Sequence, residues 1–385
     1  MPRIVFYVTG HGFGHASRVI EVINALAARR PDLEIHVRTT ASRWLFDLTT
    51  TRPVVFHVAE CDTGVAQIDS LRPDIAATVE QAARFYEGLA PRLDQEAAWL
   101  SETAPSLVVA DIPPLAFAAA HAAGIPAVGL SNFTWDWIYE GYREDLGEAG
   151  WLPARLADLQ RTAREAWRLP MHGGFDSYST VVDVPFVARH SRRGRPEVRE
   201  ALGIVGDRPV VLVSFGGVGQ EGLPLDAVAR EGGLTVVTTA PPSSPRAGTV
   251  LARRLDSGVV LVDERALYAG ALRYEDLVAA ADVVLTKPGY GIIAEAIANG
   301  AALLYTSRGR FAEYDVLVRE MPRYLRCRFI SNDDLAAGRW TPHLAALLAQ
   351  PPPPERPATN GADVVAARAL EVAGLSGGPP GRPAP

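Results

Sequence analysis

The chain has 385 residues, 48% of them hydrophobic, and its formal net charge is −6. This composition is typical of a soluble protein with sizeable apolar cores, and the length favours two domains, since one domain commonly holds ~150 residues. The mild negative charge argues against a nucleic-acid-binding surface, which is usually basic. The two cysteines, Cys61 and Cys327, have no Cys or His cluster around them, so neither a zinc site nor a disulfide framework is expected.

Targeting signals are not evident in the sequence. The chain enters an apolar segment directly, without a signal-like stretch, and no run approaches the ~20 apolar residues that span a bilayer. We therefore expect a cytoplasmic protein without a transmembrane segment.

The first predicted strand, residues 4–9, leads into a glycine loop and then an amphipathic helix. The glycines at positions 10, 12 and 14 do not match the GxGxxG dinucleotide fingerprint, and the next strand, 34–38, lacks the acid that would bind a ribose, which disfavours an NAD site. His11 and His15 in this loop could accept a proton from a substrate hydroxyl. The alternative for each is a loop or helix-capping histidine without a chemical role.

Two later strands of the first half also end in polar residues. The strand 106–111 ends in Asp111, at the edge where the His15 loop is expected, so its carboxylate could orient a histidine, bind a hydroxyl or cap the next helix. The strand 127–131 runs into an aromatic segment, 132–139, that could stack on a sugar or pack under a loop. Other expected elements are a strand at 54–58, helices at 69–101, 115–123 and 153–168, and a strand at 181–187.

A basic segment rich in helix breakers, residues 190–196, separates the two halves. We expect a first domain at 1–190, a linker at 191–196 and a second domain at 197–350. A proline-rich segment with a closing helix follows at 351–375, and the Gly/Pro-rich tail 376–385 is expected to be disordered.

The second half contains a strand, a tight turn and a helix over residues 281–300. Lys287, Gly289 and Gly291 lie in or just after the turn, where free backbone amides attract phosphate and a lysine adds positive charge. Glu295 in the helix could accept hydrogen bonds from ribose hydroxyls. The alternative is a plain strand-turn-helix unit. Further strands are expected at 210–215, 234–239, 259–262 and 302–305, with helices at 197–202 and 274–282 and a mixed-charge helix start at 308–315.

Strands and helices alternate in both halves, which predicts an α/β protein with two doubly wound parallel sheets. Ligands of such folds bind at the carboxyl edges of the strands, so two domains facing across a cleft could each hold one ligand. Neither a DxD motif nor a GxxxxGK[ST] loop is present.

The sequence resembles the GT-B glycosyltransferases, and in particular the glycosyltransferase-like N-terminal module of plant L-arabinokinases and its stand-alone bacterial relatives. The resemblance extends to about Val372, and its most specific segments are residues 7–19, 132–136, 214–217 and 287–295. Sugar kinase activity, which belongs to the other half of the plant proteins, is not implied. The N-acetylglucosaminyltransferase of peptidoglycan synthesis is similar more distantly, but its paired glutamines are replaced here by Ala312 and Glu313, which leaves the donor sugar open.

This resemblance implies transfer of a sugar from a UDP-linked or other nucleotide-diphosphate sugar to the hydroxyl of a small molecule or glycan, with inversion and without a metal or cofactor. His15 would act as the base, assisted by Asp111. The implied donor-binding residues are Ser214, Gly216, Gly217, Lys287, Gly289, Tyr290, Gly291, Glu295 and Glu313. The implied acceptor-side residues are His11, Gly12, Gly14, Asn132, Trp135 and Asp136. Alternatives are a non-catalytic nucleotide-sugar-binding module, or an epimerase or hydrolase on the same fold.

Overall fold

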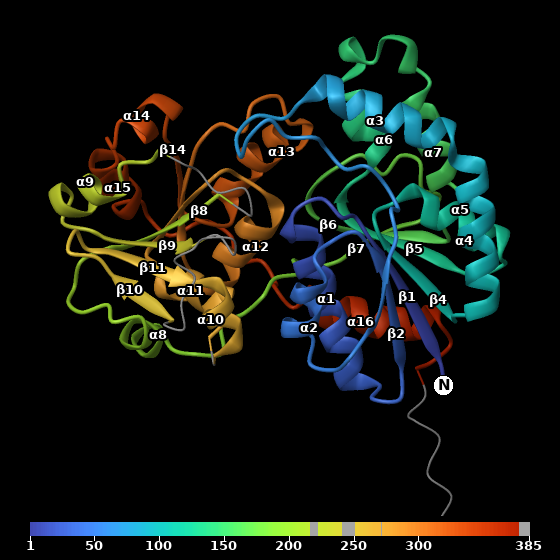
Figure 1. Cartoon of the computed structure of the whole chain (residues 1–385), viewed down its shortest axis with the longest axis horizontal. Coiled ribbons are helices and arrows are strands. Elements are labelled where there is room, and N and C mark those ends of the chain that lie inside the picture. The colour runs from blue at the N-terminus through green and yellow to red at the C-terminus, as the bar shows by residue number, and fades with distance from the viewer. Residues whose placement is uncertain (216–221, 241–250, 271, 377–385) are drawn as a thin grey trace, which may run out of the picture. The chain divides into compact units, whose positions relative to one another are not determined.

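The computed structural model describes residues 1–215, 222–240, 251–270 and 272–376, which form two compact units (Figure 1). Unit 1 comprises Met1–Ala66, Asp74–Val187 and the chain from Ala358 onward. Unit 2 comprises Gln67–Pro73 and Ala188–Pro357. The division after Val187 lies a few residues before the linker expected at 191–196. The closing helix joins unit 1, and a short piece of the first half joins unit 2.

Unit 1 contains a parallel sheet in the order β3-β2-β1-β4-β5-β6-β7. The middle strands consist largely of Val, Ile, Leu and Ala and are buried along most of their length, as expected for strands covered on both faces. The strands are β1 Arg3–Val8, β2 Glu34–Thr39, β3 Val55–Val58, β4 Leu107–Asp111, β5 Ala127–Phe133, β6 Glu165–Gly173 and β7 Val181–Asp183. The helices are α1 Phe13–Arg29, α2 Arg43–Thr49, α3 Ile75–Glu87, α4 Leu89–Thr103, α5 Pro114–Ala122, α6 Trp135–Glu140, α7 Leu152–Gln160 and α16 Gly361–Val372.

Strand β6 corrects a sequence prediction, because its first residues were expected to be helical. Helix α7 ends at Gln160, and residues 165–173 then run parallel to β5. Trp167, Leu169 and Met171 are buried while the residues between them are less so, which is the alternation of a strand. Burial of this apolar row against β5 outweighs the local helical pattern.

Unit 2 contains a second sheet, in the order β10-β11-β9-β8-β12-β13-β14 over the described residues. All pairs are parallel except β10 with β11, so the expectation of a parallel sheet holds apart from one edge. The strands are β8 Val210–Ser214, β9 Thr235–Ala240, β10 Ala252–Arg254, β11 Val259–Asp263, β12 Val283–Thr286, β13 Ala302–Tyr305 and β14 Cys327–Phe329. The helices are α8 Arg195–Ala201, α9 Leu225–Glu231, α10 Glu264–Ala269, α11 Tyr274–Ala280, α12 Tyr290–Asn299, α13 Ala312–Glu320, α14 Asn332–Ala336 and α15 Thr341–Leu348.

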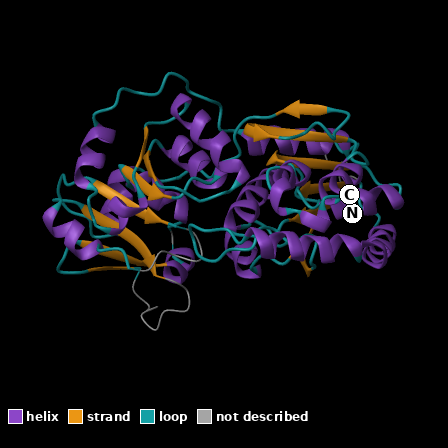
Figure 2. Ribbon diagram, turned by 90° about the horizontal axis from the view of Figure 1, so that it is seen from above, coloured by secondary structure: helices purple, strands orange, loops and turns teal. Residues whose placement is uncertain are grey.

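Both sheets reverse their strand order at the centre, and Figure 2 shows helices lying against the strands of each. In unit 1 the reversal falls between β1 and β4, where Val8 pairs with Asp111. In unit 2 it falls between β8 and β12, where Ser214 pairs with Thr286. The loops that leave the carboxyl ends of two such strands diverge and leave a crevice for ligand. The fold therefore positions one ligand edge in each unit.

The C-terminal helix α16 completes unit 1 by packing along α1, although 331 residues separate their nearest ends (Figure 1). The carboxylate of Glu165 on β6 accepts hydrogen bonds from Arg368 at 2.8 and 2.9 Å. The amide of Gly361 donates to the carbonyl of Phe186 at 2.9 Å. These contacts explain why the end of the chain belongs to the unit that contains its beginning.

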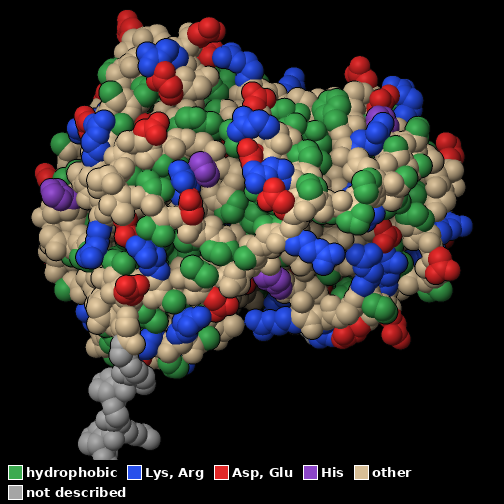
Figure 3. All heavy atoms as spheres, turned by 180° about the vertical axis from the view of Figure 1, so that it is seen from behind, with side chains coloured by type: hydrophobic (Ala, Val, Ile, Leu, Met, Phe, Trp, Pro, Cys, Tyr) green, Lys and Arg blue, Asp and Glu red, His purple; other side chains and the backbone are tan. Residues whose placement is uncertain are grey.

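The length and hydropathy of the helices, and the distribution of charged side chains on the surface, can be compared with what a membrane or a nucleic acid would require. Within the described part of the chain, no helix combines the length and the apolar character that crossing a bilayer requires. On the face drawn in Figure 3, Lys and Arg side chains are interspersed with Asp and Glu over the surface. That face therefore presents charges of both signs rather than one continuous basic area.

Candidate functional site

A histidine and an aspartate meet at the carboxyl edge of the sheet of unit 1. Gly12, the N-cap of α1, has a φ of 73°, so the chain turns sharply after β1 and His15 falls in the first helical turn. Asp111 is the last residue of β4, the strand beside β1. His15 Nδ1 lies 2.8 Å from Asp111 Oδ1. The two residues that the sequence proposed as a catalytic pair are therefore in direct contact.

Arg18 is a third member of this cluster, and the sequence analysis did not identify it. Its Nε donates to Asp111 Oδ2 and its Nη2 to Asp111 Oδ1, both at 2.5 Å, and its Nη1 donates to Asn132 Oδ1 at 2.9 Å. Arg18 follows His15 by three residues, so the helix presents both on one face. Arg18 occupies one of the buried positions of an amphipathic helix, and a charged residue at such a position is a signal that could have revealed it.

The hydrogen-bond geometry indicates which nitrogen of His15 carries the proton. Nδ1 lies near both Asp111 Oδ1 and Arg18 Nη2, at 2.8 and 2.9 Å. Both hydrogens of Nη2 already have acceptors, Asp111 Oδ1 and Ser131 Oγ. Nδ1 therefore carries the proton and donates a hydrogen bond to the carboxylate, and Nε2 is left as the basic atom. Among the described residues, none bonds Nε2.

Asp111 stays ionised in spite of complete burial. Burial by itself raises the pKa of the carboxyl, but the positive charges of Arg18 and His15 and their hydrogen bonds lower it further, so that the pKa lies below its ordinary value. A permanently charged carboxylate can orient His15 and stabilise its protonated form.

The remaining residues expected on the acceptor side have different surroundings. Asn132 binds Arg18 and so belongs to the His15 cluster, whereas the indole of Trp135 donates to Asp62 Oδ2 at 3.1 Å. Asp136 accepts from the Gln160 amide at 2.8 Å when that amide is oriented to satisfy both of its groups. Gly14 is exposed in the first turn of α1.

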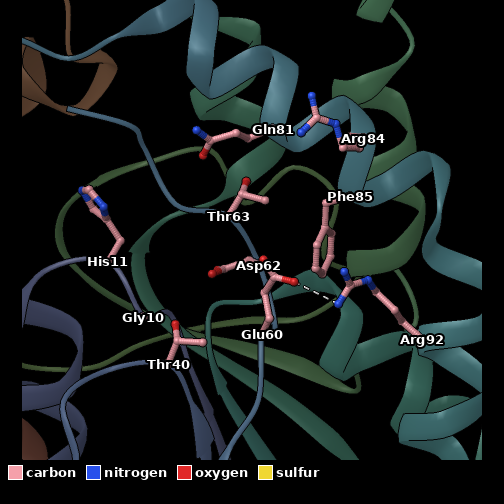
Figure 4. A pocket seen from close by; sticks show the side chains of 10 residues that line it. All are labelled: Gly10, His11, Thr40, Glu60, Asp62, Thr63, Gln81, Arg84, Phe85 and Arg92. Carbon is pink, nitrogen blue, oxygen red and sulfur yellow. Dashed lines mark ion pairs between the residues drawn. The ribbon is translucent and has the colours of Figure 1, made fainter. Parts of the chain in front are cut away.

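A cavity of about 560 Å³ lies in unit 1 (Figure 4), and Gly10 and His11, from the loop between β1 and α1, form part of its lining. His11 lines it, while Trp135 and Asp136 are not among its lining residues. Gly64, whose φ is +63°, approaches so closely that a Cβ there would lie 2.5 Å from His11 Cβ. The full lining consists of Gly10, His11, Thr40, Glu60, Asp62, Thr63, Gln81, Arg84, Phe85 and Arg92.

Asp62 is the second residue that the sequence analysis missed. It is buried and accepts hydrogen bonds from the Thr9 hydroxyl at 2.6 Å and from the Trp135 indole, both at Oδ2. Burial raises the pKa of this carboxyl to about 6, although its two donors and the charge of His15 oppose the rise. It lies in a loop after β3 with no recognisable motif around it, so nothing in the sequence distinguished it from a surface acid.

In unit 2, the turn between β12 and α12 has the form expected from its glycines. Gly289, in an extended conformation, is the N-cap of α12 and has no side chain with which to cap it, and Tyr290 and Gly291 begin the helix. Lys287 Nζ donates to the carbonyl of Ser70 at 2.5 Å, within the short piece of chain that joins unit 2. Burial, and to a lesser degree the charge of Arg308, lowers the pKa of Lys287 to about 8.

The acids expected to hold the donor already have arginine partners. Glu295 is buried and accepts a hydrogen bond from Arg189 at 2.6 Å, and Glu313 pairs with Arg308 at 3.7 Å. Ser214 hydrogen-bonds the Tyr274 hydroxyl at the end of β8. Gly216 and Gly217 lie outside the described residues. No group of three or more His, Cys, Asp or Glu able to hold a metal ion is found in the described ranges.

Comparison with known proteins agrees with this architecture. The profile of "Glycosyl transferase family 1" matches residues 2–136. The fold is similar to that of the kitacinnamycin glycotransferase (TM-score 0.60, 18% identity, 97% of this chain and 96% of that one). It is also similar to UGT2 of Phytolacca americana in complex with UDP-2fluoro-glucose and pterostilbene, with a TM-score of 0.59 and 15% identity over 97% of this chain and 94% of that one. A third similar structure is SnogD of Streptomyces nogalater, with a TM-score of 0.55 and 18% identity over 97% of this chain and 99% of that one. These likenesses, all at 18% identity or less, show the fold, and the chain thus has the GT-B fold of these glycosyltransferases.

In sequence, the chain is similar to L-arabinokinase of Arabidopsis thaliana. The two sequences are 32% identical over 356 residues, which is 90% of this chain. The chain spans about a third, 32%, of the length of that relative. The match therefore concerns one part of the larger protein.

Proposed function

We propose that the protein transfers a sugar from a nucleotide-diphosphate sugar, UDP-linked, to an acceptor hydroxyl, with inversion and without a metal. The observation that carries the proposal is the contact of His15 with Asp111, because it orients an imidazole with its basic nitrogen directed away from the carboxylate. A base held in this way can take the proton of an attacking hydroxyl. Unit 1 supplies the base and the acceptor site, and unit 2 holds the donor.

The proposed step is a single displacement. The acceptor O–H gives its proton to His15 Nε2 while its oxygen forms a bond to the anomeric carbon. The bond between that carbon and the diphosphate oxygen breaks, and the nucleoside diphosphate leaves with the electron pair. Asp111 stabilises the imidazolium that forms, and Arg18 keeps the carboxylate in place.

Two cations near the Gly289 turn support diphosphate binding in unit 2. Lys287 and Arg308 interact electrostatically, and the N-cap residue of α12 is Gly289, which has no side chain to compete with a ligand. An ammonium has three N–H donors, so Lys287 can keep its bond to Ser70 and still donate to a phosphate oxygen. A bound diphosphate would favour protonated Lys287, and the helix amides would stabilise the negative charge of the leaving group.

The direct test is an incubation of the full chain with a panel of nucleotide sugars, with and without candidate acceptor alcohols. We expect free nucleoside diphosphate only when an acceptor is present, an unchanged rate in excess chelator, and a product of inverted anomeric configuration by NMR. Release without acceptor would instead indicate a hydrolase, and binding without release would indicate a binding module.

Replacement of the base gives the first mutational prediction. His15→Ala should lower turnover by roughly 10²- to 10⁴-fold, the usual contribution of general-base catalysis, while nucleotide affinity stays unchanged. His121→Ala, at an exposed histidine of α5 in the same unit, is the matched control and should retain full turnover. Wild-type turnover in His15→Ala would exclude His15 as the base.

A further inference from the structure

The walls of the cavity in unit 1 are unusually polar for a small-molecule site. Pockets of ~300–1,000 Å³ are ordinarily lined mainly by apolar and aromatic side chains. In this cavity of about 560 Å³, one aromatic ring, Phe85, faces two carboxylates, two guanidinium groups, an amide, an imidazole and two hydroxyls (Figure 4). A flat apolar molecule would leave most of these groups without hydrogen bonds, which is costly.

Asp62 is the buried polar group of this cavity. Its Oδ2 is occupied by Thr9 and Trp135, whereas no described residue donates to Oδ1. The side chain is 8% exposed, and Figure 4 shows it directed into the cavity. A carboxylate held by two donors on one oxygen is fixed in orientation, and its other oxygen can accept a hydroxyl of a ligand.

The rim of the cavity suits a ligand with neighbouring hydroxyls. Glu60 and Arg92 form an ion pair of 3.0 Å with side chains 52% and 43% exposed, so either can rotate toward a ligand at little cost. Vicinal hydroxyls can donate to one carboxylate and accept from one guanidinium. Gln81 on the exposed face of α3 adds a donor and an acceptor, and Phe85 offers a ring against which the C–H face of a sugar can pack.

The cavity is linked to His15 by direct contacts. Trp135, which binds Asp62, packs its ring edge-on against Phe133 at 5.2 Å between centroids, and Phe133 packs edge-on against His15 at 5.6 Å. Thr9, the other partner of Asp62, directly follows β1. A ligand on Asp62 is therefore held at the strand edge that carries the proposed base.

We propose that this cavity binds the acceptor, and that the acceptor is a small polyhydroxylated molecule, a free sugar or a cyclic polyol, with one hydroxyl donating to Asp62. The assignment of the ligand as acceptor rests on the proposed glycosyl transfer. The binding of a polyol to Asp62 is independent of that proposed function. Asp62 is then a binding and specificity-determining residue distinct from the His15–Asp111 pair.

The test measures binding without any donor, by saturation-transfer NMR and calorimetry with the full chain. The probes are a panel of aldopentoses, aldohexoses and inositols and a panel of flat phenols. We expect at least one polyol to bind, with the affinity reduced tenfold or more by Asp62→Asn and weakened by Gln81→Leu, a change at an exposed position that leaves folding unaffected. Asp158→Asn, at an exposed acid of α7 in the same unit, is the control and should bind as the wild type does.

Binding of flat phenols in preference to polyols would overturn the inference, and so would the absence of polyol binding or an affinity unchanged in both variants. These outcomes are separate from those of the transfer assay. Polyol binding that depends on Asp62, without diphosphate release from any donor, would reject the proposed function and keep the site. Transfer to phenols alone would keep the function and reject the polyol acceptor.

Discussion

Arg18 and Asp111 form a buried ion pair whose members come from a helix and a strand. Asp111 is fully buried and Arg18 is 5% exposed. Taking two charges out of water is costly, and their attraction compensates only because the guanidinium contacts both carboxylate oxygens. Loss of one partner leaves the other charge buried without compensation.

Arg18→Met should therefore destabilise the protein by roughly 3–5 kcal/mol, the usual cost of breaking a buried pair, as measured by denaturant unfolding. It should also slow turnover, because Asp111 would no longer be fixed against His15. In an Asp111→Asn background the same change should cost much less. An equal cost in both backgrounds would show that the ion pair does not account for the effect.

Replacement of Asp62 should stabilise the protein at neutral pH, in contrast to replacement of Arg18. The pKa of Asp62 in the folded protein, about 6, lies above the ordinary value of 3.8, so the folded state binds more protons between these pH values. The contribution of Asp62 to stability is therefore present below pH ~4 and is lost as the pH rises through 6. Asp62→Asn should raise the melting temperature at pH 7 and change it little at pH 4. A lower melting temperature at pH 7 would contradict this prediction.

The sequence predicted His15 and Asp111 because Asp111 ends one strand and His15 follows the glycine loop after another, and adjacent parallel strands bring these ends together. Arg18 and Asp62 could not be found in this way. Arg18 reaches a partner 93 residues away, and Asp62 accepts from a hydroxyl 53 residues away, so neither partner can be named from neighbouring positions. For Arg18 the local signal is its place on the buried face of α1, whereas Asp62 has none. Glu295 was predicted to bind ribose from its place in a helix, and the sequence did not indicate that Arg189 already donates to its carboxylate.

At the level of elements, the start of α1 determines where His15 lies. Gly12 has the positive φ that L residues rarely adopt, whereas Gly14, two residues later, is part of the helix. A Cβ added at either position would have no neighbouring atom within 4 Å, so only backbone conformation separates the two glycines.

These two glycines give a matched pair of substitutions. Gly12→Ala should destabilise the protein by about 1–3 kcal/mol, because its φ of 73° and ψ of 175° lie in a backbone region that is essentially confined to glycine. Gly14→Ala should instead stabilise it by about 0.5–1 kcal/mol, because glycine is a poor helix former. Both are measured by denaturant unfolding, and equal effects would mean that Gly12 does not form the turn before α1.

Most strands were predicted from continuous apolar runs, and the three that were missed lack such runs. Strand β6 contains Glu165, Arg168 and Pro170 and begins five residues after the end of α7, so its pattern resembled a longer helix. Strands β10 and β14 have three residues each and lie at sheet edges, where pairing with a neighbour decides their conformation.

On the scale of the molecule, two arginine–carboxylate pairs connect α16 to the rest of unit 1, and they differ in burial. Arg368 bonds Glu165, whose side chain is 9% exposed, whereas Arg29 and Asp363 are 42% and 62% exposed. Arg368→Met should lower the free energy of unfolding by roughly 1–3 kcal/mol, as for lost hydrogen bonds to a charged group. Arg29→Met should stay within ~0.5 kcal/mol. Comparable losses in calorimetry would indicate that burial does not set the strength of these pairs.

The chain passes from one unit to the other after Ala66, Pro73, Val187 and Pro357. Leu71, in the segment Gln67–Pro73 that belongs to unit 2, packs on the core of that unit. A single recombination event at the middle of the gene would consequently deliver a second half that lacks Leu71 and a first half that lacks α16. With the donor bound by unit 2, as proposed, an exchange of donor specificity between relatives by swapping halves requires that at least these two segments stay with their units.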